Sequence, residues 1–108
     1  MRMMTDKIDF IVIWEFQVAP DSQLAFEKVY GPAGDWATFF RHSRDYRGTQ
    51  LFRDLDRPGR YLTFDRWSSR EALHQFKQAH QARYDAFDQE CEGLTSREAL
   101  IGEFESVS

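Results

Sequence analysis

The first apolar segment of the chain has a period of two. Alternate residues from Ile8 to Val18 are apolar: Ile8, Phe10, Val12, Trp14, Phe16 and Val18. This period is typical of a β-strand with one buried face. Ile11 and Ile13 make the opposite face apolar as well, which a strand covered on one side does not require. We therefore expect residues 8–18 to form a strand whose second face is also partly covered.

Two helical segments are predicted after this strand. Pro20-Asp21-Ser22 interrupts the alternation and offers helix caps. Apolar residues then recur at helical spacings: Ala25, Phe26, Val29 and Tyr30. Gly31-Pro32 ends this helix. Asp35 can cap a second, shorter helix, whose apolar side is formed by Trp36, Phe39 and Phe40.

A β-hairpin is predicted in the middle of the chain. Residues 49–55 and 60–67 are strand-like and are joined by Asp56-Arg57-Pro58-Gly59. Proline at the second turn position followed by glycine is typical of a tight turn. In the second arm one face carries Leu62 and Phe64, and the other carries Tyr61, Thr63 and Trp67.

The strongest helical pattern follows the hairpin. Ser68-Ser69-Arg70-Glu71 has the form of a capping box, with Ser68 as the cap. Residues at spacings of three and four then form one continuous stripe: Leu73, Phe76, His80, Tyr84, Phe87 and Cys91. We expect one long helix that ends at Gly93, and a last strand near residues 98–104.

The order of these elements predicts an α+β protein with the β-α-β-β-α-β ferredoxin-like fold. Helices would cover one face of an antiparallel sheet in a single domain spanning residues 8–105. A chain of 108 residues buries enough surface to fold without metal or disulfide. The apolar second face of the sheet needs a cover, and a second copy of the chain, stacked sheet on sheet in a homodimer, would provide it.

Charge and cysteine content exclude several classes of protein. The 14 basic and 18 acidic residues give a net charge of -4 without a basic stripe, so neither nucleic acid nor a membrane surface is an expected partner. The single cysteine, Cys91, suits a reducing compartment. The N-terminal residues lack the apolar core of a signal peptide. We therefore expect a cytoplasmic protein.

The most informative candidate for chemistry is His80, which replaces an apolar residue in the helical stripe. An imidazole there is either an acid or base in a pocket, or an axial ligand. The alternative is an interior or rim histidine that bonds one neighbour and does no chemistry. The sequence leaves both interpretations open.

Aromatic residues are the second group of candidates. Trp67 ends its strand and either walls a pocket with its indole N–H or simply packs, and Trp14 and Trp36 allow the same two interpretations. Tyr84 can donate a hydrogen bond to a phenolate. Four more residues are expected in the core and the pocket lining: Phe26, Phe39, Phe40 and Phe76. Phosphate loops, nucleophile elbows and zinc-ligand spacings do not occur, so we predict neither cofactor nor metal.

The segment from residue 61 to residue 80 resembles the antibiotic biosynthesis monooxygenase family of dimeric α/β barrels. The matching residues are Trp67, Ser68, Glu71-Ala72, Phe76 and His80. The resemblance implies a homodimer with one pocket in each subunit. It also implies activities known in the family, which includes oxygenases that convert phenolic substrates into quinones without a cofactor, and haem-degrading enzymes.

We therefore expect a cofactor-independent monooxygenase that acts on a small aromatic, phenolic molecule in an apolar pocket. His80 would deprotonate the substrate or hold its anion, and Trp67, Tyr84 and Trp14 would position it. A first alternative is a non-catalytic or stress-related barrel that binds an apolar ligand, because the chain lacks the asparagine that several family members carry on the first strand. A second is haem binding or degradation, although Trp67 precedes the helix and does not match the tryptophan of haem degraders.

Overall fold

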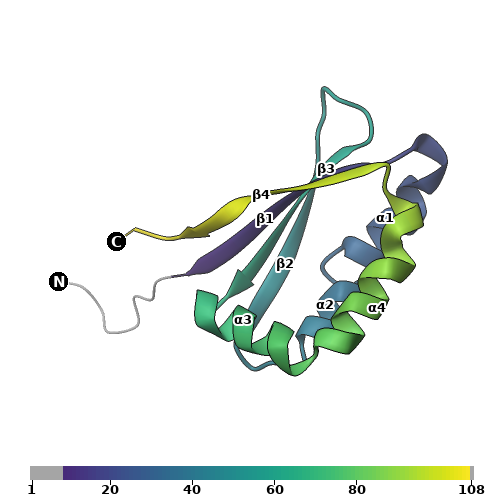
Figure 1. Ribbon diagram of the computed structural model, residues 1–108. Helices are drawn as coiled ribbons and strands as arrows, with labels where there is room; N and C mark the ends of the chain where they lie inside the picture. Colours follow the sequence, from purple (N-terminus) through teal and green to yellow (C-terminus); the bar gives the residue numbers. More distant parts are fainter. Residues whose placement is uncertain (1–8, 108) are drawn as a thin grey trace.

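The computed structural model describes residues 9–107 and contains one antiparallel sheet of four strands in the order β2-β3-β1-β4 (Figure 1). The elements in chain order are β1 (Phe10–Gln17), the 3-10 turn η1 (Pro20–Ser22), α1 (Gln23–Tyr30), α2 (Asp35–Phe40), β2 (Tyr46–Arg53), β3 (Arg60–Trp67), α3 (Arg70–Ala79), α4 (Gln81–Cys91), the 3-10 turn η2 (Glu92–Leu94) and β4 (Arg97–Glu105). Ile8, the predicted start of the first strand, lies outside the described residues.

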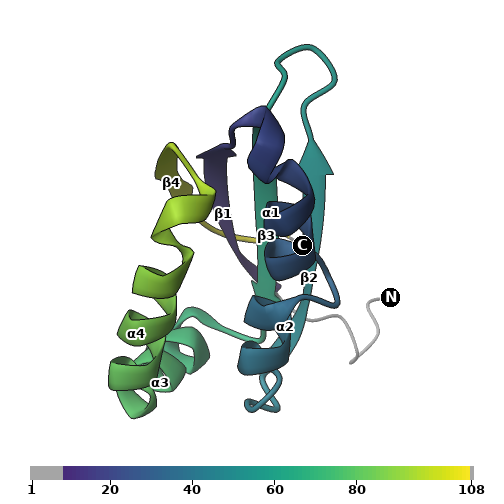
Figure 2. The same cartoon turned by 90° about the vertical axis from the view of Figure 1, so that its right-hand side faces the viewer.

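The helices lie together on one face of the sheet, which leaves the opposite face without a covering helix (Figures 1 and 2). The two central strands, β1 and β3, pair antiparallel over their whole length, and β2 and β4 form the edges. This arrangement confirms the predicted α+β ferredoxin-like fold. The strand order is that of a repeated β-α-β unit, in which the helices of both repeats pack on the same face of the sheet.

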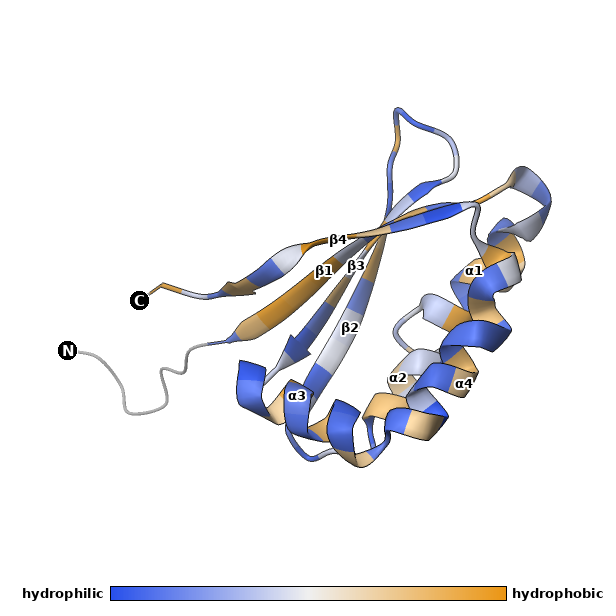
Figure 3. Cartoon of the chain, viewed as in Figure 1, coloured by the Kyte–Doolittle hydropathy of each residue, from blue (hydrophilic) through white to orange (hydrophobic). Residues whose placement is uncertain are grey.

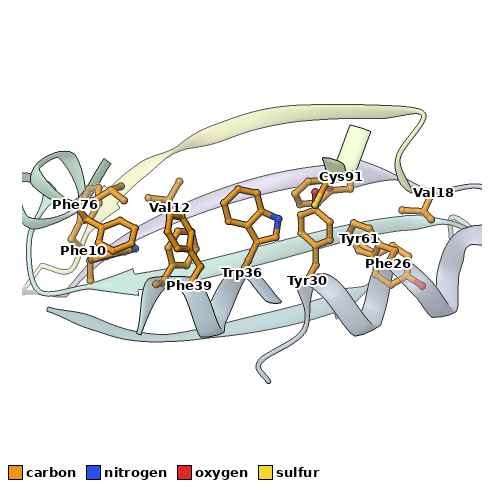
Figure 4. Close-up of a cluster of buried hydrophobic side chains, with 14 residues drawn as sticks. Phe10, Val12, Val18, Phe26, Tyr30, Trp36, Phe39, Tyr61, Phe76 and Cys91 are labelled. Atoms are coloured by element: carbon orange, nitrogen blue, oxygen red, sulfur yellow. The ribbon is translucent and has the colours of Figure 1, made fainter. Parts of the chain in front are cut away.

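The alternation in β1 determines which side chains form the core. Phe10, Val12 and Phe16 point toward the helices and are buried. Figure 4 shows the buried side chains as a row along the sheet, from Phe10 at one end to Val18 at the other. The figure places Trp36, from α2, near the middle of this row. Burial of these large side chains is the main favourable contribution to folding.

The chain reverses between β2 and β3 as the sequence predicts. The backbone N–H of Arg60 donates to the carbonyl oxygen of Arg57 at 3.2 Å, and Gly59 has a φ of 82°. A positive φ directly after proline is the geometry of a type II turn, and glycine adopts it without steric cost. The first strand of the hairpin runs over Tyr46–Arg53 instead of residues 49–55. It ends early because the Asp54 carboxylate begins the turn by accepting bonds from the backbone N–H groups of Asp56 and Arg57.

The predicted long helix is in fact two helices, so that prediction was wrong. His80 has φ -122° and ψ 28° and is both the C-cap of α3 and the N-cap of α4. The break could not be seen in the sequence because the apolar spacing continues through it. The change of direction places the rings of Tyr84 and Phe87 against Trp36, at 5.1 and 4.3 Å between centroids.

The cap of α3 is Ser69, one residue later than predicted. Its hydroxyl accepts from the backbone N–H of Ala72 at 3.0 Å, which is the usual bond of an N-cap serine. Ser68 is still paired with the loop before β2, because its backbone N–H donates to the carbonyl oxygen of Asp45 at 2.8 Å and its hydroxyl donates to the carboxylate of the same residue. The helix therefore begins only after this pairing ends.

The uncovered face of the sheet is apolar at its centre. The strand register places the following residues on it: Ile11, Ile13, Phe52, Leu62, Phe64 and Phe104. Phe52 and Phe104 are 48% and 45% exposed. Ion pairs flank this centre, between Arg60 and Glu15 on one side and between Arg66 and Asp9 on the other. Figure 3 shows the contrast between the apolar stretch of β1 and the hydrophilic outer sides of α3 and α4.

None of the helices in residues 9–107 is both long enough and apolar enough to span a bilayer.

Candidate functional site

A pocket of about 200 Å³ lies between the sheet and the helices. The strands contribute Trp14, Phe16, Thr49, Thr63, Asp65 and Glu98 to its lining, and the helices contribute Tyr30, Trp36, Phe40, Lys77, Tyr84 and Asp88. Half of these residues are aromatic. We call this cavity the aromatic pocket.

Trp36 is the centre of the aromatic wall. Its ring contacts Phe40 and Tyr84 of the lining at 5.6 and 5.1 Å between centroids. The side chain is 8% exposed, and its indole N–H has no hydrogen-bond acceptor among the described residues. Such rings can make stacking and edge-to-face contacts with a planar ligand, without competing polar groups.

The polar part of the pocket is a row of hydroxyl groups that ends on a carboxylate. Thr49 and Asp65 are direct cross-strand partners on β2 and β3, and the threonine hydroxyl donates to Oδ1 of Asp65 at 2.6 Å. The hydroxyl of Tyr46 lies 2.5 Å from that of Thr49. A threonine hydroxyl has one proton, so Tyr46 is the donor in this second bond. The result is a chain from Tyr46 through Thr49 to Asp65.

A β-bulge makes this chain of hydrogen bonds possible. Residues three apart on a regular strand point to opposite faces, yet Tyr46 and Thr49 both face the helices. The register of β2 against β3 shifts between Tyr46 and Gly48, and Gly48 has a φ of 123°. Glycine is favoured at such a φ because it has no Cβ. The extra residue in β2 therefore turns the Tyr46 hydroxyl toward Thr49.

Asp65 is an ionisable group in apolar surroundings. Burial raises its pKa to about 6, although the bond from Thr49 acts in the opposite direction. The side chain keeps some exposed surface, and this surface faces the pocket that it lines. Lys77 also lines the pocket, but within the described residues it forms no ion pair with Asp65. Its ammonium instead lies 5.0 Å from the ring centroid of Tyr84.

The other ionisable residues of the lining have different environments. Asp88 and Glu98 are exposed and mark the mouth of the pocket. Burial, together with the nearby carboxylate of Asp88, raises the pKa of Glu98. Burial also raises the pKa of Tyr84 and of Tyr30, so both keep their hydroxyl protons at neutral pH and act as donors.

The predicted site residues fall into three groups. The pocket lining contains Trp14, Trp36, Phe40 and Tyr84. The core, outside the lining, contains Phe26, Phe39, Trp67 and Phe76, all of which are buried. The third group is His80, which is half-buried at the junction of α3 and α4.

The imidazole of His80 packs among rings away from the pocket lining. Its ring centroid is 4.5 Å from that of Phe76, 5.9 Å from that of Phe39 and 6.5 Å from that of His42. The backbone N–H of Tyr84, the next residue of the predicted stripe, donates to the carbonyl oxygen of His80 at 2.8 Å, yet only the Tyr84 side chain belongs to the pocket lining. Its catalytic role stays a prediction.

Sequence reasoning missed Asp65, Thr49 and Thr63 as site residues. A signal for Asp65 was present, because it shares the strand face of Tyr61, Thr63 and Trp67, and a carboxylate on a face otherwise expected to be buried is unusual. Thr49 carried no such signal, since its contact with Asp65 depends on the strand register. Among residues 9–107, no group of three or more histidine, cysteine or acidic side chains is placed to hold a metal ion.

A family comparison fits this geometry. The sequence profile described as antibiotic biosynthesis monooxygenase matches residues 9–88. The chain belongs to this family. The match covers most of the elements that build the aromatic pocket, and it confirms the resemblance inferred from the segment between Trp67 and His80.

Solved structures of similar fold are found in several organisms. A mutant form of SnoaB, a cofactor-independent oxygenase from Streptomyces nogalater, is 16% identical, covers 93% of this chain and 94% of its own, and has a TM-score of 0.68. Rv0793 from Mycobacterium tuberculosis is 24% identical over 93% and 94% of the two chains, with a TM-score of 0.59. PA3566 from Pseudomonas aeruginosa is 15% identical over 94% and 97%, with a TM-score of 0.64. At these identities the likeness shows the fold. A comparison with curated proteins found no match.

Proposed function

We propose that this member of the antibiotic biosynthesis monooxygenase family oxidises a small phenolic aromatic molecule in the aromatic pocket without a cofactor. The observation that carries the proposal is a cavity with six aromatic residues in its lining and with the polar side chains of Thr49, Thr63 and Asp65 on its sheet side. Apolar walls with a few placed polar groups are typical of sites for small aromatic ligands. The oxygenase among the structures of similar fold supports the same class of reaction.

The size of the pocket limits the substrate. A cavity of about 150 Å³ is enough to hold benzene, and the aromatic pocket has about 200 Å³. We therefore infer a substrate with one or two fused rings. The lining contains no histidine among the described residues that could serve as an axial ligand, which argues against haem.

The proposed reaction uses molecular oxygen and takes its electrons from the substrate. A phenol with hydrogen on the para carbon reacts with one O₂ to give a quinone and one water. The para C–H and the phenolic O–H bonds break, one oxygen atom forms the second carbonyl, and the other leaves as water with the two hydrogens. The aromatic walls would orient the ring, and the hydroxyl groups of Thr63 and Tyr84 are suited to donate to the developing anion.

Oxygen uptake with phenols of one, two and three fused rings tests the proposal. We expect uptake with the one- and two-ring compounds and little with three rings, together with a product that has gained one oxygen and lost two hydrogens by mass spectrometry. His80→Ala should keep its rate within about twofold, because the imidazole lies outside the lining. A large loss in that variant would restore histidine as the base.

A non-catalytic ligand-binding role is the second candidate. The observation in its favour is the small number of polar groups inside the pocket, of which only Thr49, Thr63 and Asp65 come from the covered face of β2 and β3. In that case aromatic phenols would raise the melting temperature with the logarithm of their concentration once it exceeds Kd, but no product would appear. Product formation would show that binding is not the whole function.

We also propose that a second copy covers the open face of the sheet. An apolar centre with a rim of ion pairs is the usual composition of a protein interface, and this face has that composition. Light scattering should give twice the mass of the chain. Phe104→Lys should weaken the dimer strongly, whereas Leu55→Lys should not, because Leu55 is 94% exposed in the hairpin loop. A wild-type protein that is monomeric at micromolar concentration would refute the dimer.

A further inference from the structure

Asp65 has a position that none of the other ionisable groups of the pocket shares. It lies on central strand β3, between Val12 on one neighbouring strand and Thr49 on the other. The remaining ionisable groups that face the pocket are Lys77 of α3, Tyr84 and Asp88 of α4, Tyr30 of α1 and Glu98 of β4. Asp65 is therefore the carboxylate held inside the sheet, whereas the other two carboxylates are at the mouth.

The other inner groups are not proton acceptors at neutral pH. Tyr30 and Tyr84 retain their protons because burial raises the pKa of each hydroxyl. The ammonium of Lys77 has no lone pair. A substrate hydroxyl in the interior of the pocket thus has one carboxylate to which it can donate.

The hydrogen bonds of Asp65 leave one of its oxygens available. Oδ1 accepts from Thr49 at 2.6 Å, and Thr49 is in turn held by Tyr46. Oδ2 accepts no hydrogen bond from the residues that the structure describes. The two hydroxyl groups thus fix the orientation of the carboxylate and leave its second oxygen for a ligand.

We propose that Asp65, oriented by Thr49 and Tyr46, is the catalytic base that takes the proton from the phenolic hydroxyl of the substrate. The inference rests on the proposed function. The phenol O–H bond breaks, a carboxyl O–H bond forms on Asp65, and the electron pair stays on the phenolate, which reduces O₂. O₂ adds to the para carbon, and the para C–H and O–O bonds then break to form the second carbonyl. The oxygen atom that leaves takes the para hydrogen and the proton from Asp65 to become water, and the carboxylate is regenerated.

The Asp65 carboxyl must be ionised to accept a proton, and this requirement sets the direction in which kcat/KM changes with pH. Burial raises the pKa of Asp65 to about 6, so kcat/KM should rise with pH up to about 6 and then level off. The charged groups that share the pocket with Asp65 are Lys77 and the exposed carboxylates of Asp88 and Glu98. Thr49 favours the ionised form, so Thr49→Val should move the rise to higher pH.

The activity test compares the wild-type protein with Asp65→Asn, Thr49→Val and the control Asp85→Asn. Asp85 is exposed on α4 outside the pocket lining. We expect Asp65→Asn to lose roughly 100-fold or more in kcat/KM and to lose the rise near pH 6. We expect Thr49→Val to keep most of kcat but to show the displaced rise. A wild-type pH profile in Asp65→Asn would overturn the proposal.

A binding test separates this inference from the proposed function. 1-Naphthol has the hydroxyl donor and 1-methoxynaphthalene lacks it, and both can be followed by quenching of pocket tryptophans. The wild-type protein should prefer the phenol by roughly tenfold to a hundredfold, the value of a hydrogen bond to a charged group, and Asp65→Leu should lose this preference while it still binds the ether. Preference without any turnover would refute the oxidation but keep Asp65 as the acceptor. An unchanged preference in Asp65→Leu would refute the acceptor itself.

Discussion

Trp67→Ala is expected to destabilise the protein by about 4 kcal/mol, the typical cost of removing a buried tryptophan. The side chain is 0% exposed. Its ring lies 5.4 Å from each of Phe40, Tyr46 and Phe76, so its removal leaves a cavity between the helices and the sheet. Urea denaturation measures the change in the free energy of unfolding, and Leu24→Ala, at a position 84% exposed, should change it by less than about 0.5 kcal/mol.

A second variant distinguishes packing from chemistry at Trp67. The indole N–H is buried and has no acceptor among the described residues, so Trp67→Phe removes an unsatisfied donor and keeps most of the ring contacts. We expect it to cost roughly 1–2 kcal/mol and to retain phenol turnover at a temperature where it is folded. A fully folded Trp67→Phe with strongly reduced kcat would instead support the catalytic role that the sequence suggested for this residue.

Asp65→Asn is expected to make the protein more stable above pH 6, by up to about 3 kcal/mol. The carboxyl has its ordinary pKa of 3.8 in the unfolded chain, and burial raises the pKa to about 6 in the folded protein. Between these values the folded state binds more protons, so the wild-type protein loses stability as pH rises from about 4 to 6. Each unit of this difference corresponds to about 1.4 kcal/mol. An asparagine carries no charge and still accepts the bond from Thr49.

The measurement is the difference in unfolding free energy between Asp65→Asn and the wild-type protein at pH 4 and at pH 8. This difference should be small at the lower pH and large at the higher pH, whereas Asp85→Asn should show no such trend. Equal differences at both pH values would mean that Asp65 is not a buried carboxylate. A gain in stability together with a loss of activity is common for residues whose burial serves function.

The fold could be predicted because its signals are local. The alternation in β1 specified both the strand and its buried face, since successive side chains on a strand point to opposite sides. Pro58 and Gly59 specified the reversal between β2 and β3, because the turn needs a positive φ at its third position. The family resemblance between Trp67 and His80 rested on residues that are adjacent in sequence, and the profile match over residues 9–88 confirms it.

The sequence was less informative about the pocket, because helical spacing does not show where a helix bends. The stripe through Phe76, His80 and Tyr84 has the same spacing on both sides of His80, and only the packing of α4 on Trp36 shows that the chain turns there. Tyr84 consequently lines the pocket, while His80 packs on Phe76.

The high aromatic content of the sequence by itself determined that the pocket would be aromatic. Four of the residues that we predicted from the sequence line it: Trp14, Trp36, Phe40 and Tyr84. The tertiary structure alone decided which polar group reaches the interior. Thr49 and Asp65 are 16 residues apart and meet through the register of two strands, and the bulge before Gly48 adds Tyr46 to them. Contacts of this kind depend on how distant segments align, and the spacing of residues along one segment carries no record of that alignment.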